Sequence, residues 1–399
     1  MNMAHKDTLW IISELFPPEE TSTGYIMGEI ASAMTRKYDV KVICGPEVYD
    51  EKKKRVSGRS QAIDDSIELR RVAAVKEDKK NKLSRIKKFL LMSWQLYKVA
   101  KKNIKKGDRV LMVSNPFPLI IMMGHLRKRR VFNLFMLVHD VFPEGLFTDM
   151  HLPSFAYRLS EKLFNKAYSR VDTLISLGRD MNEILEKKCS KQNHIPKIVT
   201  IENWGDVDGI KPMERVQDGT IKIQYAGNIG NAQGVGEMVE LLHEASNESV
   251  LLNIWGTGSA EDRIKSRVRE LNMDNSVKFK GPYSRNQQQE VLNDSDLSLV
   301  TLVKGMYGLG VPSKTYNILA AGKPILFIGE KGTEIWRTVE ENQIGYCFEP
   351  DDKDGVVYFL RSLSVASCSR FSAMGHTARQ VAEHNYSKKK IMEKFLEVI

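Results

Sequence analysis

Short apolar runs alternate with longer amphipathic stretches along almost the whole chain. In the first half, the runs predict buried strands at residues 8–13, 39–45, 110–114, 132–140, 171–178 and 197–203. The pattern restarts in the second half, with runs at residues 221–227, 250–256, 276–281, 296–302 and 324–329. The segments between the runs have helical periodicity, beginning with residues 23–37, and this alternation is typical of parallel sheets. The sequence therefore predicts an α/β protein with two doubly wound sheets.

Residues 204–220 separate the two sets of strands and are polar, with Gly and Pro among them. A chain of 399 residues is long enough for two domains, at roughly 150 residues for each. We expect an N-terminal domain over residues 1–204, a C-terminal domain over residues 205–384 and a final helix over residues 385–399. Ligands of such sheets bind at the carboxyl ends of the strands, so the site is expected in a cleft between two facing sheets.

The charge balance changes this picture, because 60 Lys and Arg against 50 Asp and Glu give a formal net charge of +10. Residues 76–106 are the densest basic segment, and residues 126–130 are a second one. In the first segment apolar residues recur at helical spacing among lysines: Leu83, Ile86, Leu90, Trp94 and Tyr97, with Lys82, Lys87, Lys88, Lys98, Lys101 and Lys102. Such a helix can lie on anionic lipid, or it can pack on the core with its lysines in solvent. Nucleic acid is the least favoured partner, because no zinc-finger or RNA-binding motif accompanies the basic runs.

Cysteine usage and hydropathy bear on the compartment. Cys44, Cys189, Cys347 and Cys368 form no CxxC pair and have no metal-ligand spacing. The first apolar run is followed at once by two prolines and acidic residues, which is unlike a secretory signal, and no apolar run reaches about 18 residues. We expect a protein of the cytoplasm or of a membrane surface.

Glycine-rich turns follow several strands of the second half. Residues 225–234, 254–264 and 279–286 each place glycine at a strand end, and residues 308–314 do so before a helical pattern. One such turn by itself is equally well a plain connection between strand and helix. Four turns at one sheet edge predict an extended ligand along that edge, such as a nucleotide diphosphate.

The last of these turns opens the stretch GLGVPSKTYNILAAGKPIL, residues 308–326. Backbone N–H groups at the start of a helix are unpaired and attract anions, and the Lys314 ammonium would add a positive charge there. Ser313 and Lys314 are therefore a candidate phosphate site. The alternative is that Ser313 only caps the helix and that Lys314 is solvated.

In the first half, Thr23 and Gly24 begin a helix after the first strand and are a second candidate anion contact. His139 and Asp140 stand at another strand end, where a polar pair favours a functional role over a structural one. Asn115 is a lesser candidate, with a turn residue as its alternative. The sequence has no GxxxxGK[ST], GxSxG or HExxH motif, and no GxGxxG follows the first strand.

The segments FPPEETSTGYIMGEIASAM, LVHDVFPEG, TIENWGDVDGIKP, YAGNIGNAQG, IWGTG, FKGPYSRNQ and GVPSKTYNILAAGKPIL resemble, in this order, those of glycosyltransferase family 4. The resemblance covers nearly the whole chain. It is greatest to the bacterial O-antigen, capsule and colanic-acid branch, including its L-fucosamine transferase-like members. The resemblance implies a GT-B fold, in which two Rossmann-like domains face a central cleft, with the final helix crossing back to the N-terminal domain. It also implies a retaining transfer of a hexosyl or N-acetylhexosaminyl group from a nucleotide sugar, with no metal and no cofactor.

The resemblance carries roles to individual residues. The catalytic residues would be His139, Asp140 and Lys314. The donor would be bound by Thr23, Gly24, Gly227, Asn228, Gln233, Gly256, Gly281, Tyr283, Pro312, Ser313, Lys314, Thr315 and Asn317.

This chain also departs from the family pattern. Asn228 and Gln233 stand where many members have Arg and Lys for the diphosphate. Leu309 or one of its neighbours, and Asn317, stand where they have paired glutamates. We hypothesise that Lys314 neutralises the diphosphate instead, and that Asn317 hydrogen-bonds the ribose.

The expected function is transfer of a sugar from a nucleotide diphosphate sugar, with UDP favoured, to a lipid-linked saccharide in cell-surface polysaccharide biosynthesis. The protein is expected to be cytoplasmic and peripheral on the inner face of the cell membrane, with its basic N-terminal domain on anionic lipid. The alternative is a non-catalytic GT-B protein that binds a nucleotide sugar or a glycan as a scaffold. No nucleic-acid partner is expected.

Overall fold

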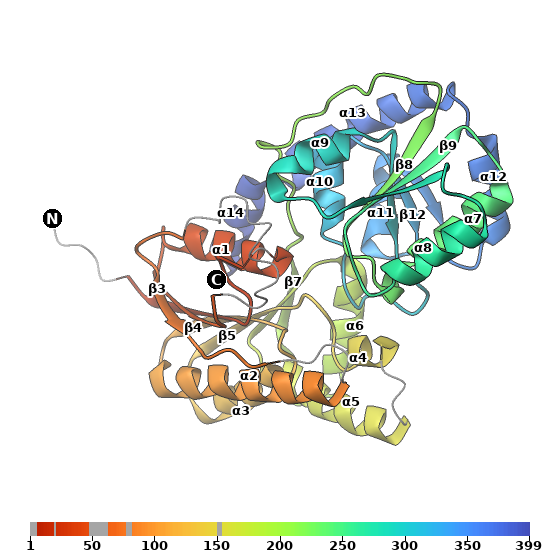
Figure 1. The fold of residues 1–399 in the computed structure, drawn as a ribbon. Helices are drawn as coiled ribbons and strands as arrows, with labels where there is room; N and C mark the ends of the chain where they lie inside the picture. Colours follow the sequence, from red (N-terminus) through yellow and green to blue (C-terminus); the bar gives the residue numbers. More distant parts are fainter. Residues whose placement is uncertain (1–5, 20, 48–62, 77–81, 150–153) are drawn as a thin grey trace. The chain divides into compact units, whose positions relative to one another are not determined.

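The computed structural model describes residues 6–19, 21–47, 63–76, 82–149 and 154–399 (Figure 1). Its contacts divide the chain into two compact units. The first unit comprises Met1–Ile201, Gly308–Gly310 and Met392–Ile399. The second unit comprises Glu202–Tyr307 and Val311–Ile391. Each unit contains one parallel sheet, as the two sets of apolar runs predict.

The sheet of the first unit has seven strands in the order β3-β2-β1-β4-β5-β6-β7. Their bounds are Thr8–Ser13 (β1), Asp39–Cys44 (β2), Glu68–Arg71 (β3), Arg109–Val113 (β4), Asn133–Leu137 (β5), Thr173–Ser176 (β6) and Lys197–Thr200 (β7). The helices are Ser22–Met34 (α1), Lys82–Asn103 (α2), Pro118–Arg129 (α3), Glu144–Asp149 (α4), Ser154–Tyr168 (α5) and Arg179–Cys189 (α6). Helices α2, α3 and α5 cover one face of the sheet and α1 covers the other (Figure 1). Burial on both faces explains why the strands read as continuous apolar runs.

The sheet of the second unit has six strands in the order β10-β9-β8-β11-β12-β13. Their bounds are Ile221–Ala226 (β8), Val250–Trp255 (β9), Val277–Gly281 (β10), Leu297–Thr301 (β11), Ile325–Ile328 (β12) and Gly345–Phe348 (β13). The α-helices are Val235–Ala245 (α7), Glu261–Glu270 (α8), Gln288–Asn293 (α9), Lys314–Ala320 (α10), Glu334–Asn342 (α11), Lys353–Ser362 (α12) and Ser367–Asn385 (α13). The last helix, Lys388–Val398 (α14), begins in this unit, and its residues from Met392 onward are grouped with the first unit. Consecutive strand residues enter cores on opposite faces. Tyr225 packs with α7, α8 and α12, whereas Ala226 packs with α9, α10, α11 and α13.

Two edge strands, β3 and β13, have no counterpart among the predicted runs. Strand β3 reads ELRR and β13 reads GYCF, and neither is fully buried at any position. An edge strand needs apolar residues on fewer of its positions, so the apolar signal is weak there. The predicted strand over residues 132–140 ends at Leu137, which places His139 and Asp140 in the loop beyond it.

Helix α2 does not bury the apolar face that its periodicity suggests. Leu90 and Trp94 are 48% and 49% exposed, while Met92 and Leu96 are fully buried. Lys88 is not a solvated lysine, because it is buried and its Nζ lies 3.3 Å from Glu14 Oε1. The alternative in which the apolar face of this helix packs on the core is therefore wrong for Leu90 and Trp94. The side chains of Lys82 and Leu83 lie outside the described residues. In the part of the chain that the structure describes, no helix has the length and hydropathy needed to cross a bilayer.

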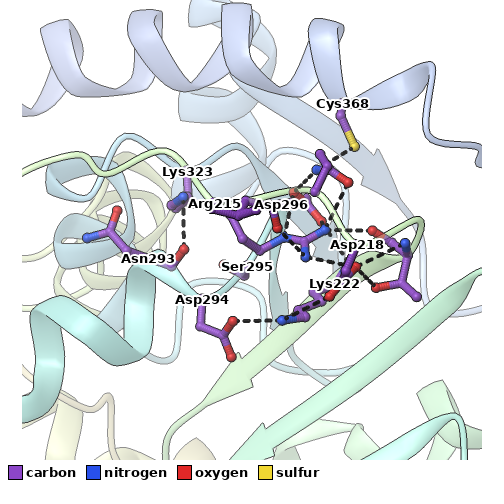
Figure 2. A network of polar contacts seen from close by, with 12 residues as sticks. Arg215, Asp218, Lys222, Asn293, Asp294, Ser295, Asp296, Lys323 and Cys368 are labelled. Atoms are coloured by element: carbon purple, nitrogen blue, oxygen red, sulfur yellow. Dashed lines mark hydrogen bonds and ion pairs between the residues drawn. The ribbon is translucent and has the colours of Figure 1, made fainter.

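The polar segment between the two sets of strands is fixed to the second unit by buried charges (Figure 2). Arg215 donates two hydrogen bonds to Asp296, with its Nε at 3.1 Å and its Nη2 at 2.8 Å from the carboxylate oxygens. The two side chains are only 6% and 7% exposed. Lys323 Nζ, also buried, donates to the carbonyl oxygens of Met213 at 3.2 Å and Asn293 at 3.3 Å. This segment is therefore part of the second unit and is not a free linker.

Candidate functional site

Several of the predicted site residues lie where the strand order of each sheet reverses. The reversal falls between β1 and β4 in the first sheet and between β8 and β11 in the second. At such a point the connections leave toward opposite faces and open a crevice at the carboxyl ends of the strands. Thr23 follows β1, Gly227 follows β8, and Lys314 begins the helix that follows β11. The doubly wound topology thus provides a binding position in each unit.

In the second unit, backbone hydrogen bonds join the turns after β8, β9 and β10. The Gly227 N–H donates to the Trp255 carbonyl at 3.0 Å, and the Gly256 N–H donates to the Gly281 carbonyl at 2.8 Å. Gly256 has a φ of +119°, and a Cβ there would overlap the Gly227 carbonyl oxygen. No other residue type fits this position without moving the turn. Three of the four predicted glycine turns therefore gather at one edge of this sheet, whereas Gly308 and Gly310 of the fourth are grouped with the first unit.

The Lys314 ammonium has no counter-ion among the residues that the structure describes. Its Nζ is inaccessible to solvent, has no hydrogen-bond partner among the described residues, and lies 3.5 Å from the centroid of the Tyr225 ring. Burial lowers the pKa of Lys314 to about 7. Its Cδ lies 3.7 Å from the point where a Cβ on Gly227 would stand, which places the lysine side chain in contact with the turn after β8. The solvated alternative for Lys314 is therefore wrong.

The alternative in which Ser313 caps the helix is also wrong. Ser313 makes no capping hydrogen bond through its side chain. The Pro312 carbonyl accepts from the Thr315 N–H at 3.2 Å, and the Thr315 hydroxyl is buried with no partner in the described part of the chain. Two polar side-chain groups, the ammonium and this hydroxyl, are thus left for a ligand or for water.

The residues at the departures from the family pattern bond to the protein itself. Asn317 Oδ1 accepts from the Asp206 N–H at 2.9 Å, so the amide oxygen of Asn317 is already hydrogen-bonded to the protein backbone. Asn228 Nδ2 lies 3.5 Å from Gln233 Oε1, and this amide pair folds over Gly230. None of these three side chains carries a charge, so Lys314 is the candidate site residue that brings positive charge to this edge.

Three aromatic residues lie near this edge, and of these Tyr283 is a predicted site residue, whereas Tyr225 and Trp255 are not. Tyr283 packs edge to face on Trp255 with ring centroids 6.0 Å apart, and burial raises the pKa of Tyr283. Trp255 Nε1 is buried without a partner among the described residues. The sequence-based prediction does not include Tyr225 and Trp255, although they stand two residues and one residue before Gly227 and Gly256, and an aromatic residue at a strand end is a readable signal.

In the first unit, Thr23 and His139 are brought together. Thr23 Oγ1 lies 3.4 Å from His139 Nδ1. His139 Nε2 is buried and has no partner in the described residues, and burial lowers the pKa of His139 to about 4. The imidazole is therefore neutral at physiological pH. The Gly24 N–H donates to Thr21 Oγ1 at 3.1 Å, so this amide serves the helix cap.

Asp140 is held beside His139 by the chain after β4. Asn115 Nδ2 donates to Asp140 Oδ2 at 2.7 Å, and Ser114 Oγ accepts from the N–H groups of His139 and Asp140 at 3.1 and 3.2 Å. Burial raises the pKa of Asp140, and the hydrogen bond from Asn115 opposes this shift. The segment Gly308–Gly310, grouped with this unit, adjoins the same loop, since the Val141 N–H donates to the Leu309 carbonyl at 3.0 Å.

The chemistry available to these residues is limited. In the residues that the structure describes, no group of three or more His, Cys, Asp or Glu is placed to hold a metal ion. The first unit offers a neutral imidazole and a carboxyl group that are oriented by hydrogen bonds. The second unit offers one buried ammonium among glycine turns, which suits an anion that can approach the backbone closely.

Comparison with known proteins agrees with this arrangement. Residues 207–364 match the family model described as "Glycosyl transferases group 1". A protein of Pseudomonas aeruginosa named as a glycosyltransferase, WbjE, is 30% identical over 398 residues, covering 97% of this chain and 96% of its own. A protein of Escherichia coli (strain K12) named for colanic acid biosynthesis, the glycosyltransferase WcaI, is 25% identical over 57% of this chain and 56% of its own.

A solved structure supports the fold. The structure of Anabaena Alr3699/HepE in complex with UDP superposes with a TM-score of 0.68 at 11% identity, covering 98% of this chain and 99% of that one. The two parallel-sheet units are those of the GT-B fold, as the resemblance implies. The comparisons do not distinguish an L-fucosamine transferase from other members. Its motifs, its fold and its full-length relative show that this chain belongs to the group 1 glycosyltransferases.

Proposed function

We propose that the protein transfers a sugar, with retention, from a nucleotide diphosphate sugar to a lipid-linked saccharide in the biosynthesis of a cell-surface polysaccharide. UDP is the favoured nucleotide, because the related fold of HepE was solved with UDP. Polysaccharide synthesis is favoured by the relative named for colanic acid biosynthesis. Retention, and a hexosyl or N-acetylhexosaminyl donor, follow from the resemblance to family 4.

The unpartnered Lys314 ammonium is the observation that carries this proposal. A buried cation without a counter-ion costs stability, so its presence at the ligand-binding edge of the sheet suggests that a bound anion supplies the missing charge. The diphosphate of the donor fits, since the turn beside the ammonium carries no side chain at Gly227 and lets a ligand approach closely. Lys314 would then stabilise the negative charge on the leaving nucleoside diphosphate, with no metal in the proposed step.

We assign the acceptor side and the transferred sugar to the first unit. His139 Nε2 is buried, unpartnered and neutral, so it can exchange a hydrogen bond with a sugar hydroxyl without adding charge. Thr23 fixes the imidazole through Nδ1, and Asn115 fixes the Asp140 carboxyl group. These bonds orient the polar groups before substrate binds, which is the protein's contribution to such a transfer.

We assign lipid contact to helix α2, on the inner face of the cell membrane. Four exposed lysines lie along this helix: Lys87, Lys98, Lys101 and Lys102. No Asp or Glu occurs between Lys82 and Asn103. A basic helix without carboxylates is attracted to anionic headgroups. Replacing these four lysines with Gln should abolish binding to anionic vesicles and leave nucleotide binding unchanged.

The first test is a thermal-shift comparison with UDP, GDP, ADP and no ligand, on wild type and on Lys314→Ala. We expect one diphosphate to raise the Tm of wild type and to lose this effect in Lys314→Ala. Lys331→Ala is the matched control, because Lys331 is an exposed lysine of the same unit. A folded wild type that responds to no nucleotide would refute the donor assignment.

The second test is transfer itself, measured with UDP-sugars and a lipid-linked saccharide acceptor. Retention predicts that the new glycosidic bond has the anomeric configuration of the donor, which NMR of the product reads directly. A product of opposite configuration would contradict the mechanism and leave the group 1 fold intact.

The non-catalytic alternative has one observation in its favour, since Asn317 already bonds the chain where many family members carry a glutamate. A scaffold protein would bind the nucleotide sugar and catalyse neither transfer nor donor hydrolysis. Release of free nucleoside diphosphate from the purified protein in the presence of acceptor therefore separates the two functions.

A further inference from the structure

Helix α5 presents an apolar stripe to solvent that the sequence analysis does not identify. Phe155, Leu159 and Leu163 are 73%, 62% and 48% exposed. A spacing of four residues puts their side chains on one face of the helix, each a turn from the next. Single exposed apolar residues are common, but a stripe of three along one helix indicates a surface with an unfilled partner.

A basic stripe runs beside the apolar one. Arg158, Lys162 and Lys166 are exposed and have the same four-residue spacing, each one residue from the apolar stripe or its continuation. The face is therefore amphipathic in a particular sense, since cations rather than mixed charges border the apolar groups. This pattern suits the boundary between acyl chains and anionic headgroups.

The opposite side of α5 is firmly held, so the exposed stripe is not the result of a loosely attached helix. Phe164 packs on Phe117 and Phe142, with ring centroids 6.2 Å apart in both pairs. Tyr168 Oη accepts from the Phe142 N–H at 3.1 Å. Tyr157 Oη donates to Glu144 at 3.3 Å, within the segment that begins at His139 and leads to the helix. The orientation of α5 is thus fixed by the loop that carries the proposed acceptor residues.

Helix α2 presents a similar face on the same side of the first unit. Helix α3 packs against both α2 and α5, and all three cover one face of the sheet (Figure 1). Leu90, Leu91 and Trp94 are 48%, 41% and 49% exposed, with Lys87 before them and Lys98 after them. Two separate helices therefore carry exposed apolar residues that are bordered by cations.

We infer that α5 and α2 together form a membrane-docking face, whose apolar residues enter the interfacial layer of a bilayer that contains anionic lipid. The basic stripes favour lipid over a second copy of this chain, because the same face on two copies would bring cation against cation. The inference deepens the proposed function and rests on it in one respect, that the acceptor is carried by the same bilayer. The new part of the inference is that the apolar residues of α5 insert into the bilayer, in addition to the attraction between the α2 lysines and the headgroups.

The test measures binding of the full chain to vesicles of phosphatidylcholine alone and of phosphatidylcholine with phosphatidylglycerol, without any donor. Wild type should sediment with the anionic vesicles only. Phe155→Ser combined with Leu159→Ser should weaken this binding at least tenfold, from the apolar area withdrawn from the bilayer. Arg158→Gln combined with Lys162→Gln should weaken it about fivefold per charge removed.

The matched control is Val216→Ser combined with Tyr358→Ser. These residues of the second unit are 88% and 75% exposed, so the control removes a similar exposed apolar pair from another surface. It should bind vesicles as wild type does. Equal binding by wild type and Phe155→Ser/Leu159→Ser would overturn the inference. So would a wild-type dimer, by light scattering, that this variant splits, because a second copy would then cover α5.

The nucleotide thermal shift, measured on the same samples, separates this inference from the proposed function. Loss of vesicle binding with an intact nucleotide shift supports the docking face. Vesicle binding that depends on α5 in a protein without any nucleotide shift leaves the docking face standing and refutes the donor assignment.

Discussion

Lys314 should make donor binding depend on pH in a way that can be calculated. Burial lowers the pKa of this ammonium to about 7 from the ordinary value of 10.5. A diphosphate binds the charged form, and its own charge raises the pKa of Lys314 in the complex, so binding takes up a proton wherever the empty protein has lost it. With a pKa of about 7, the charged fraction of empty protein is about 0.76 at pH 6.5 and about 0.03 at pH 8.5. The apparent Kd should therefore rise about 25-fold between these pH values.

Isothermal titration with a nucleotide sugar at pH 6.5, 7.5 and 8.5 measures this directly. A nucleotide sugar is preferred to a free diphosphate, because a terminal phosphate titrates near pH 6 and would add its own dependence. At pH 8 the uptake should be about 0.9 proton per site, which titrations in buffers of different ionisation enthalpy reveal. Lys331→Ala should keep the whole dependence.

Lys314→Met should bind weakly at every pH and without the 25-fold change. It should also raise the Tm of the empty protein. The sign follows from linkage, since a lowered pKa means that the unfolded chain holds this proton more tightly. The charge therefore destabilises the empty fold below about pH 10.5, most fully below pH 7. A constant Kd in wild type, or the same 25-fold change in Lys314→Met, would refute the reasoning.

Three further predictions concern other groups. Asp296→Asn should lower the free energy of unfolding by about 3 kcal/mol, because it removes the buried partner of the Arg215 guanidinium and leaves only the half-exposed Asp218 carboxylate beside it. The half-exposed Asp294→Asn should cost less than about 1 kcal/mol, and denaturant unfolding compares the two variants. Because the pKa of His139 is lowered to about 4 in the folded protein, the unfolded chain binds this proton first as the pH falls. The free energy of unfolding of wild type should therefore drop by about 2 kcal/mol between pH 7 and pH 5, and denaturant unfolding of His139→Gln should not show this drop. Gly256→Ala should destabilise the fold by several kcal/mol through overlap with a carbonyl oxygen, and Gly219→Ala, with a φ of +86° and no atom nearby, should cost only about 1 kcal/mol; thermal unfolding of the two checks this.

The fold could be predicted from the sequence because buried parallel strands leave a strong apolar signal. Strands β3 and β13 were not predicted, since an edge strand is covered less completely and can carry residues such as Arg70 or Gly345. The positions of the glycine turns followed directly from the strand order, because all parallel strands of a sheet end at one edge.

Side-chain environments were harder to predict. A sequence pattern states that a lysine begins a helix, but it does not state that the ammonium of Lys314 lies over the Tyr225 ring. Likewise, the helical spacing of Leu90 and Trp94 is the same whether they face a core or solvent, and only the packing of Met92 and Leu96 decides this. The engagement of Asn317 by a distant backbone N–H has no local signal at all.

The anchoring of residues 211–220 to the second unit also decides how a smaller protein for donor titrations should be cut. A fragment that starts at β8 would omit Arg215 and leave the buried Asp296 carboxylate without its ion-pair partner, and Lys323 would lose its bond to the Met213 carbonyl. Such a fragment is expected to be poorly soluble for reasons unrelated to nucleotide binding. A fragment that starts at Glu202 keeps every one of these bonds, so its N-terminal boundary is set by buried charge and not by the first strand.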